Sequence, residues 1–470
     1  MLQRLRSSLP ELGIVLLLAF FALRELGTFP APWADEGLFM IVAKMVAAGK
    51  GYALPLLDQT WYAPYFLNVG PTLIIPSAVS VMLFGLSIEA LRLPMVLWLT
   101  AATFLTYRFA YRLFGRRDAC WSALLLVTLS AFINTGKPVL GEIPAMVFTL
   151  LGLLALLWPR GWKRTLGAGL AFGFAFLTKI TFGLLLPALG VAWIIALARR
   201  DWKEARDLTL IGLLTVLVYL PWRMVEATYT IGGDFFAEIV NFLFAGGGET
   251  AFLRVFTEQP QLLLRMPYLA FDVFLVLGLI GLWGARKKVP VTVAATVTTA
   301  VLLFALYCFN GFGWYRLLLP AHLLLLPFVP AGAFALPAPR KVMMTGLGII
   351  CVAQFWWQFT HRGSSTATES GEAAIVVMQD FAERDLLIEQ AEIFAQLPLN
   401  PHWRFVIPNL SFSMPEEYGT VSGALCRIPL LRKMTEEQIP AFTTEGAKVT
   451  RVAGRIYLIE PPYPCPHTNE

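Results

Sequence analysis

Two adjacent carboxylates, Asp35 and Glu36, follow the first long apolar run of the sequence, in the stretch PAPWADEGLFM at residues 30–40. Neighbouring carboxylates repel one another unless a cation or a metal ion lies close to them. Such a pair suits a general base, a divalent metal site, or both. The plainer interpretation is a helix N-terminus, because Asp is a good capping residue and Glu is favourable in the first turn.

Three further stretches carry charged or phenolic side chains where apolar runs begin or end. Glu142 lies in TGKPVLGEIPAM, Lys179 lies in FLTKITFGLL, and Tyr315 and Arg316 lie in FGWYRLLLPAHLLLLP. A charge inside a bilayer costs about 2.5–3.5 kcal/mol on insertion scales, so it favours a function. The lysine and the arginine suit an anion such as a lipid phosphate. The plainer interpretations are a loop charge pair between Lys137 and Glu142, a snorkelling lysine, and an aromatic-belt residue beside a snorkelling arginine.

The composition predicts a protein that crosses a membrane many times. The chain has 470 residues, of which 57% are hydrophobic and only 14% are charged. Apolar runs of about twenty residues, the length of a transmembrane helix, recur from Leu12 to about Phe359. The net charge of +6 does not indicate a nucleic-acid partner, because the basic residues cluster between apolar runs, as the positive-inside rule predicts.

The basic clusters predict which ends of the apolar runs face the cytoplasm. With every cluster on the cytoplasmic side, the N-terminus is cytoplasmic and the tail after Thr360 lies outside. Eleven transmembrane helices connect them, at residues 10–29, 88–112, 118–136, 143–158, 164–178, 180–198, 207–224, 267–284, 289–309, 315–330 and 341–360. On this topology the candidate residues share the outer face: Asp35, Glu36, Glu142, Lys179, Arg265, Tyr315 and Arg316.

The first outer loop is expected to hold interfacial helices. Residues 66–85 are apolar enough to cross the membrane, but a crossing would move the basic cluster at 112–118 outside, and two prolines weaken a regular helix. We expect an interfacial or re-entrant helix there. Residues 35–50 predict a surface helix that ends at Gly49. The long loop at 225–266, with Gly246 to Gly248, is expected to be a lid or binding element.

The tail differs in composition from the rest of the chain. The stretch EAAIVVMQDFAERD predicts a helix, and WRFVIP and GRIYLIEP predict short strands. We therefore divide the chain into a transmembrane domain at residues 1–360 and a small extracytoplasmic α/β domain at residues 361–470. Outside the cytoplasm, Cys426 and Cys465 could form a disulfide.

Several stretches follow one another in a familiar order. WADEGLFMIVAKMVAAGKGY joins an aromatic residue, Asp-Glu and a helix that ends in Gly; LFGLSIEALRLPMVLW, FGFAFLTKITFGLLLPAL and WYRLLLPAHLLLLPF come later. From residue 33 to about 405, this order resembles the GT-C type of integral-membrane glycosyltransferases. The similarity is strongest to the branch of the protein O-mannosyltransferases and lipid A aminoarabinose transferases. The segment YAPYFLNVGP departs from that branch, because it lacks the His or Lys often found there.

The resemblance implies an enzyme that transfers a hexosyl or pentosyl group from a polyprenyl-phosphate sugar to a hydroxyl of a glycan, lipid or protein. It implies Asp35 as the general base, with Glu36 and Glu142 assisting through hydrogen bonds or a divalent metal cation bound by all three acids. It implies a donor-phosphate site made by Lys179, Arg265, Tyr315 and Arg316. No other cofactor is expected.

Polyprenyl donors and an outward tail suggest a bacterial inner membrane, with the site on the outer side and a role in modifying lipopolysaccharide or another envelope glycan. Two other functions remain open. A transporter or flippase of lipid-linked sugars predicts a polar midplane, although mid-span polar residues are few. A non-catalytic lipid-binding scaffold predicts that loss of Asp35 is harmless.

Overall fold

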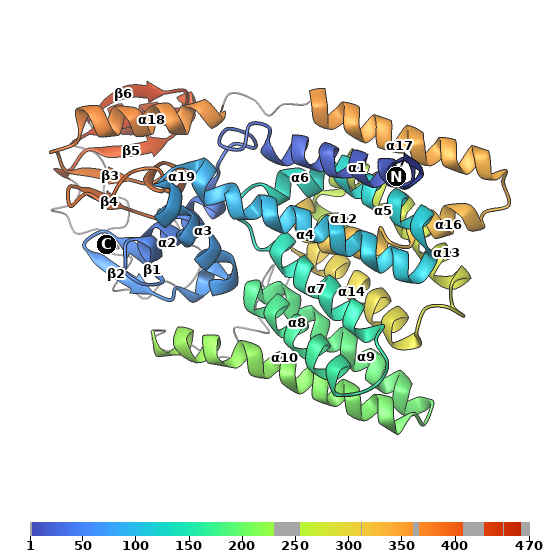
Figure 1. Cartoon of the computed structure of the whole chain (residues 1–470). Helices are drawn as coiled ribbons and strands as arrows, with labels where there is room; N and C mark the ends of the chain where they lie inside the picture. Colours follow the sequence, from blue (N-terminus) through green and yellow to red (C-terminus); the bar gives the residue numbers. More distant parts are fainter. Residues whose placement is uncertain are drawn as a thin grey trace.

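The computed structural model consists of a long helical bundle with a small β-sheet at one end (Figure 1). It describes residues 2–229, 254–311, 313–360, 366–407, 427–444 and 446–461. The glycines at 246–248 and the cysteines at 426 and 465 lie outside these ranges, so the expectations about them stay predictions.

The bundle has helical structure in all eleven segments predicted to span the membrane. The helices are α1 (Leu2–Leu23), α4 (Ile88–Phe114), α5 (Arg116–Thr128), α6 (Ser130–Gly136), α7 (Glu142–Leu156), α8 (Trp162–Thr178), η2 (Ile180–Leu184), α9 (Leu185–Ala198), α10 (Trp202–Thr228), α13 (Met266–Gly284), α14 (Val291–Asn310), α15 (Tyr315–Leu325), α16 (Val329–Ala335) and α17 (Arg340–Thr360). The short pieces α12 (Arg254–Glu258) and η3 (Pro260–Leu264) precede α13.

Six of these helical segments are long and apolar enough to cross a membrane alone. The count rises to eight if α5 with α6 and α15 with α16 each form one span, although these pairs bend by 63° and 58°. Eleven spans therefore stay a prediction, whereas a helical membrane protein is confirmed.

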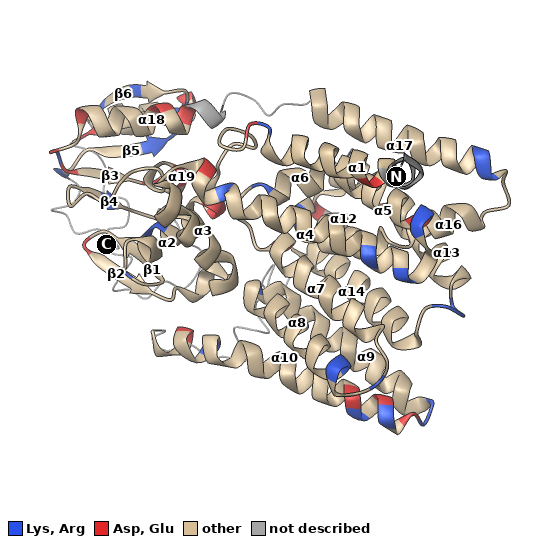
Figure 2. Ribbon diagram, in the orientation of Figure 1, with Lys and Arg blue, Asp and Glu red and all other residues tan. Residues whose placement is uncertain are grey.

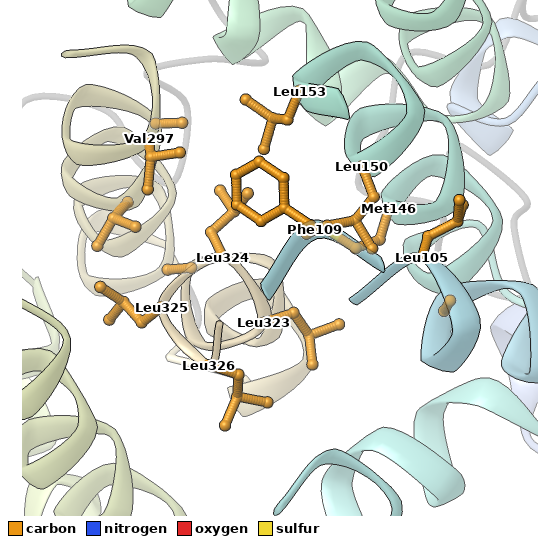
Figure 3. Packing of buried hydrophobic residues seen from close by; sticks show 14 of the residues in the cluster. Leu105, Phe109, Met146, Leu150, Leu153, Val297, Leu323, Leu324, Leu325 and Leu326 are labelled. Carbon is orange, nitrogen blue, oxygen red and sulfur yellow. The ribbon is translucent and has the colours of Figure 1, made fainter. Parts of the chain in front are cut away.

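The interior of the bundle is filled by aliphatic and aromatic side chains. Phe109 of α4 packs among Met146 and Leu150 of α7 and the leucines at 323–326 (Figure 3). Elsewhere the backbones approach closely, because a Cβ on Gly332 of α16 would overlap the carbonyl oxygen of Leu277 of α13. Such packing stabilises helix pairs within a bilayer, where the lipid is as apolar as the side chains.

The first loop forms a compact unit of α2 (Ala34–Ala47), β1 (Ala53–Leu56), β2 (Gln59–Tyr62), η1 (Tyr65–Leu67) and α3 (Pro71–Phe84). At 14 residues, α3 is about 21 Å long and shorter than the hydrocarbon layer of about 30 Å. Its interfacial position stays a prediction. The helix predicted before Gly49 is present as α2, and nine of its residues are buried under other parts of the protein. Its position on the outer membrane face stays a prediction.

The tail contains the predicted helix and strands in a mixed sheet. Its elements are α18 (Thr366–Asp380), β3 (Leu386–Ile388), α19 (Ala391–Phe394), β4 (Trp403–Phe405), β5 (Leu430–Lys433), η5 (Glu436–Gln438), α21 (Ile439–Thr443), β6 (Lys448–Ala453) and β7 (Ile456–Glu460). The strand order is β4-β3-β5-β7-β6. The strands β4, β3 and β5 are parallel, and β7 is antiparallel to both β5 and β6. The domain boundary at residue 361 and the side of the membrane stay predictions.

The sheet and the first loop are joined by a common core. The ammonium group of Lys44 in α2 donates hydrogen bonds to the carbonyl oxygens of Phe394 and Leu397, at 2.6 and 2.9 Å. The backbone N–H of Leu57, between β1 and β2, donates to the carbonyl oxygen of Phe405 in β4 at 2.9 Å. Buried side chains of α2, α3, β1 and the sheet belong to one hydrophobic cluster. The tail is therefore fixed to the loop that carries the two adjacent carboxylates.

Most lysines and arginines of the bundle lie at the helix ends away from the sheet (Figure 2). Several are paired there, including Arg164 of α8 with Glu204 of α10 at 2.5 Å. This distribution agrees with the predicted sidedness, in which the basic end is cytoplasmic and the sheet lies outside. The sidedness itself stays a prediction.

Candidate active site

The first carboxylate of the pair is joined to the start of α15. The Oδ2 of Asp35, in the first turn of α2, lies 2.5 Å from the Nη2 of Arg316. The guanidinium carbon of Arg316 lies 4.4 Å from the ring centre of Trp33 and 4.7 Å from that of Trp314. Cation–π contacts hold the arginine in place. The Asp35 side chain keeps 38% of its surface exposed, so its carboxylate is accessible.

The second carboxylate has a different environment. Glu36 and Arg92 of α4 are both fully buried and form a two-pronged ion pair, with distances of 2.7 and 2.6 Å. The Oε1 of Glu36 also accepts the backbone N–H of Val139 at 3.0 Å, and Arg92 donates to the carbonyl oxygen of Leu26. Glu36 therefore connects α2 to α4 and to the chain before α7. The capping interpretation applies only in part, because the N-cap residue of α2 is Trp33.

Glu142 and Lys179 form a second buried ion pair. The Nζ of Lys179 lies 2.5 Å from the Oε1 of Glu142 at the start of α7. Within the described part of the chain, the Oε2 of Glu142 has no hydrogen-bond partner. The predicted loop pair of Lys137 with Glu142 is wrong, because Lys137 is buried and donates to the carbonyl oxygen of Arg24. Burial lowers the pKa of Lys137 to about 8.

The backbone that precedes α3 holds Lys179 in place. Val69 forms a β-bridge with Lys179, and the N–H of Ile180 donates to the carbonyl oxygen of Asn68 at 3.2 Å. The hydroxyl of Tyr52 donates to the carbonyl oxygen of Val69 at 2.8 Å. The segment YAPYFLNVGP, which lacks the His or Lys often found in the similar glycosyltransferases, therefore lies directly beside Lys179.

The ion pairs Asp35–Arg316 and Glu142–Lys179 form one electrostatic cluster. Lys179 interacts with the charges of Asp35 and Arg316 as well as with Glu142. Glu142 in turn interacts with Arg316. The three predicted catalytic acids are thus held by three different cations, Arg316, Arg92 and Lys179, and Glu36 lies apart from the cluster. Among the residues that the structure describes, no three His, Cys, Asp or Glu side chains form a group that could bind a metal ion.

A cavity of about 690 Å³ opens beside Arg316. Arg265, at the start of α13, is exposed and provides a second cation in its wall. Tyr315 also lines the cavity, but its hydroxyl contacts the Nδ1 of the buried His322 inside α15. The remaining walls are largely apolar and aromatic: Pro30, Ala31, Trp33, Asn134, Thr135, Pro138, Leu140, Gln259, Leu262, Pro267, Tyr268, Gly313 and Trp314.

Sequence reasoning missed the two tryptophans that hold Arg316. Each lies two residues before a charged residue of the site, in Trp33-Ala-Asp35 and in Trp314-Tyr-Arg316. That shared spacing was the available signal, because an aromatic residue beside an isolated charge at a membrane boundary favours a cation–π contact. Arg92 was also missed as the partner of Glu36, since a lone arginine in an apolar segment does not identify its partner.

The comparisons with known proteins concern the family and the fold. Residues 71–224 match the model of the family described as dolichyl-phosphate-mannose-protein mannosyltransferase. ArnT from Cupriavidus metallidurans bound to undecaprenyl phosphate is similar in structure, with a TM-score of 0.65, 13% identity, and coverage of 96% of this chain and 97% of ArnT. AglB from Archaeoglobus fulgidus, an oligosaccharyltransferase in complex with an inhibitory peptide and a dolichol-phosphate, has a TM-score of 0.55 and 11% identity, with coverage of 84% and 63%. No curated protein sequence matches the chain.

These likenesses confirm that the fold is that of the GT-C type of integral-membrane glycosyltransferases. The protein therefore has the fold of this class, and its apolar helices and its partial family match support an integral membrane protein and a glycosyltransferase.

Proposed function

We propose that this protein transfers a hexosyl or pentosyl group from a polyprenyl-phosphate-linked donor to an acceptor hydroxyl on a glycan, lipid or protein. The observation that carries the proposal is an accessible carboxylate, Asp35, bound to an arginine that lines a cavity of about 690 Å³. The cavity combines two guanidinium groups, from Arg265 and Arg316, with aromatic walls. Cations suit the phosphate of the donor, and ring faces suit a sugar.

Asp35 is the general base of the proposed reaction. The acceptor oxygen attacks the anomeric carbon, its proton passes to Asp35, and the bond between the anomeric carbon and the phosphate oxygen breaks. Polyprenyl phosphate leaves with the electron pair of that bond. A carboxylate near the anomeric carbon also stabilises the positive charge that develops there. The side chains of Glu36 and Glu142 are 0% and 2% exposed, so Asp35 is the accessible acid of the three.

Arg316 and Arg265 neutralise the leaving phosphate. The planar guanidinium group binds two phosphate oxygens at once, and its effect is larger where water is excluded. Because Arg316 holds Asp35 at 2.5 Å in the free protein, an arriving phosphate competes with that carboxylate for the arginine. Donor binding thereby releases Asp35 to act as base. Lys179 adds positive charge to the cluster, and the ring of Tyr315 forms part of the wall.

Glu36 and Glu142 assist the reaction by holding other groups of the site in place. Glu36 fixes the start of α2 through Arg92, and Glu142 fixes the ammonium group of Lys179. Each of the three acids is paired with a protein cation, and the need for a divalent cation is decided by the EDTA arm of the test below. No step of the proposed reaction uses a metal. We further propose a bacterial inner membrane, with a cytoplasmic N-terminus and the sheet on the outer side.

The test incubates the purified protein in detergent with a panel of radiolabelled polyprenyl-phosphate sugars and crude membrane glycolipids, with and without EDTA. Released polyprenyl phosphate is measured for wild type and Asp35→Asn. Release by wild type that is lost in the variant supports the transferase, and the EDTA arm decides the metal requirement. Donor binding without release in either protein would favour the scaffold. Movement of intact donor across reconstituted vesicles would favour the flippase.

A further inference from the structure

A second cavity lies in the bundle, away from the candidate active site. It is a groove of about 530 Å³ that lies between α4, α7 and α8. None of its lining residues belongs to the cavity beside Arg316. The apolar part is formed by residues of all three helices and the turn after α7: Phe104, Leu105, Phe148, Leu151, Leu154, Ala155, Leu157, Trp158, Gly167, Leu170, Ala171 and Phe174.

Two arginines give one end of this groove a positive charge. Arg108 and Arg112 of α4 are both exposed and line it together. They are four residues apart and therefore point from the same face of the helix. Among the described residues neither forms an ion pair, whereas Arg116 pairs with Glu11 and Arg164 pairs with Glu204.

The charged end and the apolar part are separated along the helix axis. Phe104 lies eight residues before Arg112 on α4, which corresponds to about 12 Å. The rings of Phe148 and Phe174 lie 5.5 Å apart in the apolar part. Trp158 lies at the charged end with 46% of its surface exposed, and its ring would come within 3.0 Å of a Cβ on Gly167. A tryptophan of this kind is typical of the boundary between lipid and water.

We propose that this groove binds an anionic phospholipid from the leaflet at the basic end of the bundle. The lipid phosphate binds the guanidinium groups of Arg108 and Arg112, and an acyl chain lies along Phe104, Leu151 and Phe174. A zwitterionic phospholipid has the same chains but less net attraction for two arginines. Each basic residue near an anionic headgroup is expected to contribute about fivefold in affinity.

The test uses the full-length protein, stripped of lipid in detergent and titrated with phosphatidylglycerol or phosphatidylcholine, with native mass spectrometry as the readout. We expect one tightly retained phosphatidylglycerol and at least tenfold weaker binding of phosphatidylcholine. The double variant Arg108→Gln/Arg112→Gln should lose about twenty-fold or more in phosphatidylglycerol affinity. The variant Leu151→Trp, which fills the apolar part, should weaken the binding of both lipids.

The matched control is Arg286→Gln. Arg286 is an exposed arginine between α13 and α14 that lies outside the groove, so its loss should leave phosphatidylglycerol binding unchanged. Equal retention of the two lipids, or wild-type binding by the double variant, would show an ordinary lipid shell and overturn the proposal. Displacement of phosphatidylglycerol by a lower concentration of polyprenyl phosphate would also overturn it, in favour of a polyprenyl site.

Discussion

Arg316 is the residue on which the proposed chemistry depends most, because it contacts both Asp35 and the cavity. We expect Arg316→Gln to lower kcat/KM for the donor by about 10–100-fold, since a charge-assisted hydrogen bond is worth about 1.5–3 kcal/mol. Arg316→Lys should recover part of that loss, because the ammonium keeps the charge without the planar fork. Initial rates over a range of donor concentrations measure the effect.

The control for Arg316 is Arg404→Gln, which removes an arginine paired with Asp58 at the first loop, outside the cavity. That variant should turn over at the wild-type rate. An unchanged kcat/KM for Arg316→Gln would remove this arginine from the donor site and leave Arg265 as the cation of the cavity.

Glu36 gives a second prediction, which separates a structural role from a chemical one. Glu36→Gln leaves the buried guanidinium of Arg92 without its counter-charge, so the free energy of unfolding should fall by about 3–5 kcal/mol. Replacing both residues by methionine should restore most of the stability, because no buried charge remains. Denaturant or thermal unfolding in detergent measures it. Normal stability with lost turnover in Glu36→Gln would instead identify a catalytic acid.

For single residues, the sequence predicted which side chains share a face better than it predicted their pairing. Asp35, Glu142, Lys179 and Arg316 were expected on one face, and they do form one cluster. Asp35 and Arg316 are 281 positions apart, so only the fold could pair them. The charges of Asp35 and Glu36 are equal and adjacent, yet burial gives them different environments, which local sequence does not encode.

Among the secondary-structure elements, the close contact between the start of α3 and the turn at Lys179 gives a testable prediction. A Cβ on Gly70 would overlap the carbonyl oxygen of Leu177, so Gly70→Ala must push α3 away from that turn. We expect a loss of about 1–3 kcal/mol in stability together with lower turnover, because Lys179 loses its backbone support. Unfolding scans and donor release measure the two effects in the same preparation.

Gly212→Ala in α10 is the matched control. Outside its own helix backbone and chain neighbours, no atom lies within 4 Å of the position of its Cβ, and alanine is the better helix former, so stability should be unchanged or slightly higher. If Gly70→Ala behaves like this control, the close approach of α3 to the Lys179 turn does not support the site.

The helices were predictable because an apolar run of about twenty residues has few alternatives in a bilayer. The two bends were not predictable, because the two helices at each break together form one apolar stretch. The bend between α15 and α16 is explained by Pro330 in the first turn of α16, where its ring is incompatible with a continuous helix. At the other bend, Leu129 adopts an extended conformation with ψ of 109°, and no proline is present there.

For the molecule as a whole, a buried carboxyl group in the tail sheet predicts a dependence of stability on pH. Glu389 follows β3 and is buried, with Arg432 of β5 at 3.3 Å. Burial raises the pKa of Glu389 to about 7, although the charge of Arg432 opposes the shift. The folded protein therefore holds a proton that the unfolded chain releases near pH 4.5, the ordinary value for this carboxyl.

The direction in which stability changes with pH follows from the higher pKa of Glu389 in the folded protein. The stability due to protonated Glu389 is fully present below about pH 4.5 and is lost as the pH rises through about 7, by on the order of 3 kcal/mol. Glu389→Gln mimics the protonated form, so it should unfold at a higher temperature than wild type near pH 8 and at a similar one near pH 5. Glu460→Gln, on the same sheet and more exposed, serves as control. Parallel pH curves for wild type and Glu389→Gln would contradict the assignment.

The common core of the sheet and the first loop could not be predicted from the sequence. Alternation along β3 shows that it has two buried faces, since Leu386 and Ile388 face one cluster and Leu387 the other. That pattern does not say which element covers each face. The structure shows that α18, α19 and α2 share the cluster on one of them. The contact of α2 with α19 thereby brings the tail next to the helix that carries Asp35.

The most direct test of Asp35 as the general base compares donor binding with sugar transfer in wild type and Asp35→Asn. Each protein is loaded with a radiolabelled polyprenyl-phosphate sugar, and a single round of transfer to acceptor is followed. If Asp35 is the general base, Asp35→Asn should bind the donor with undiminished affinity and transfer the sugar about 10²–10⁴-fold more slowly. Transfer by Asp35→Asn at the wild-type rate would contradict this role of Asp35.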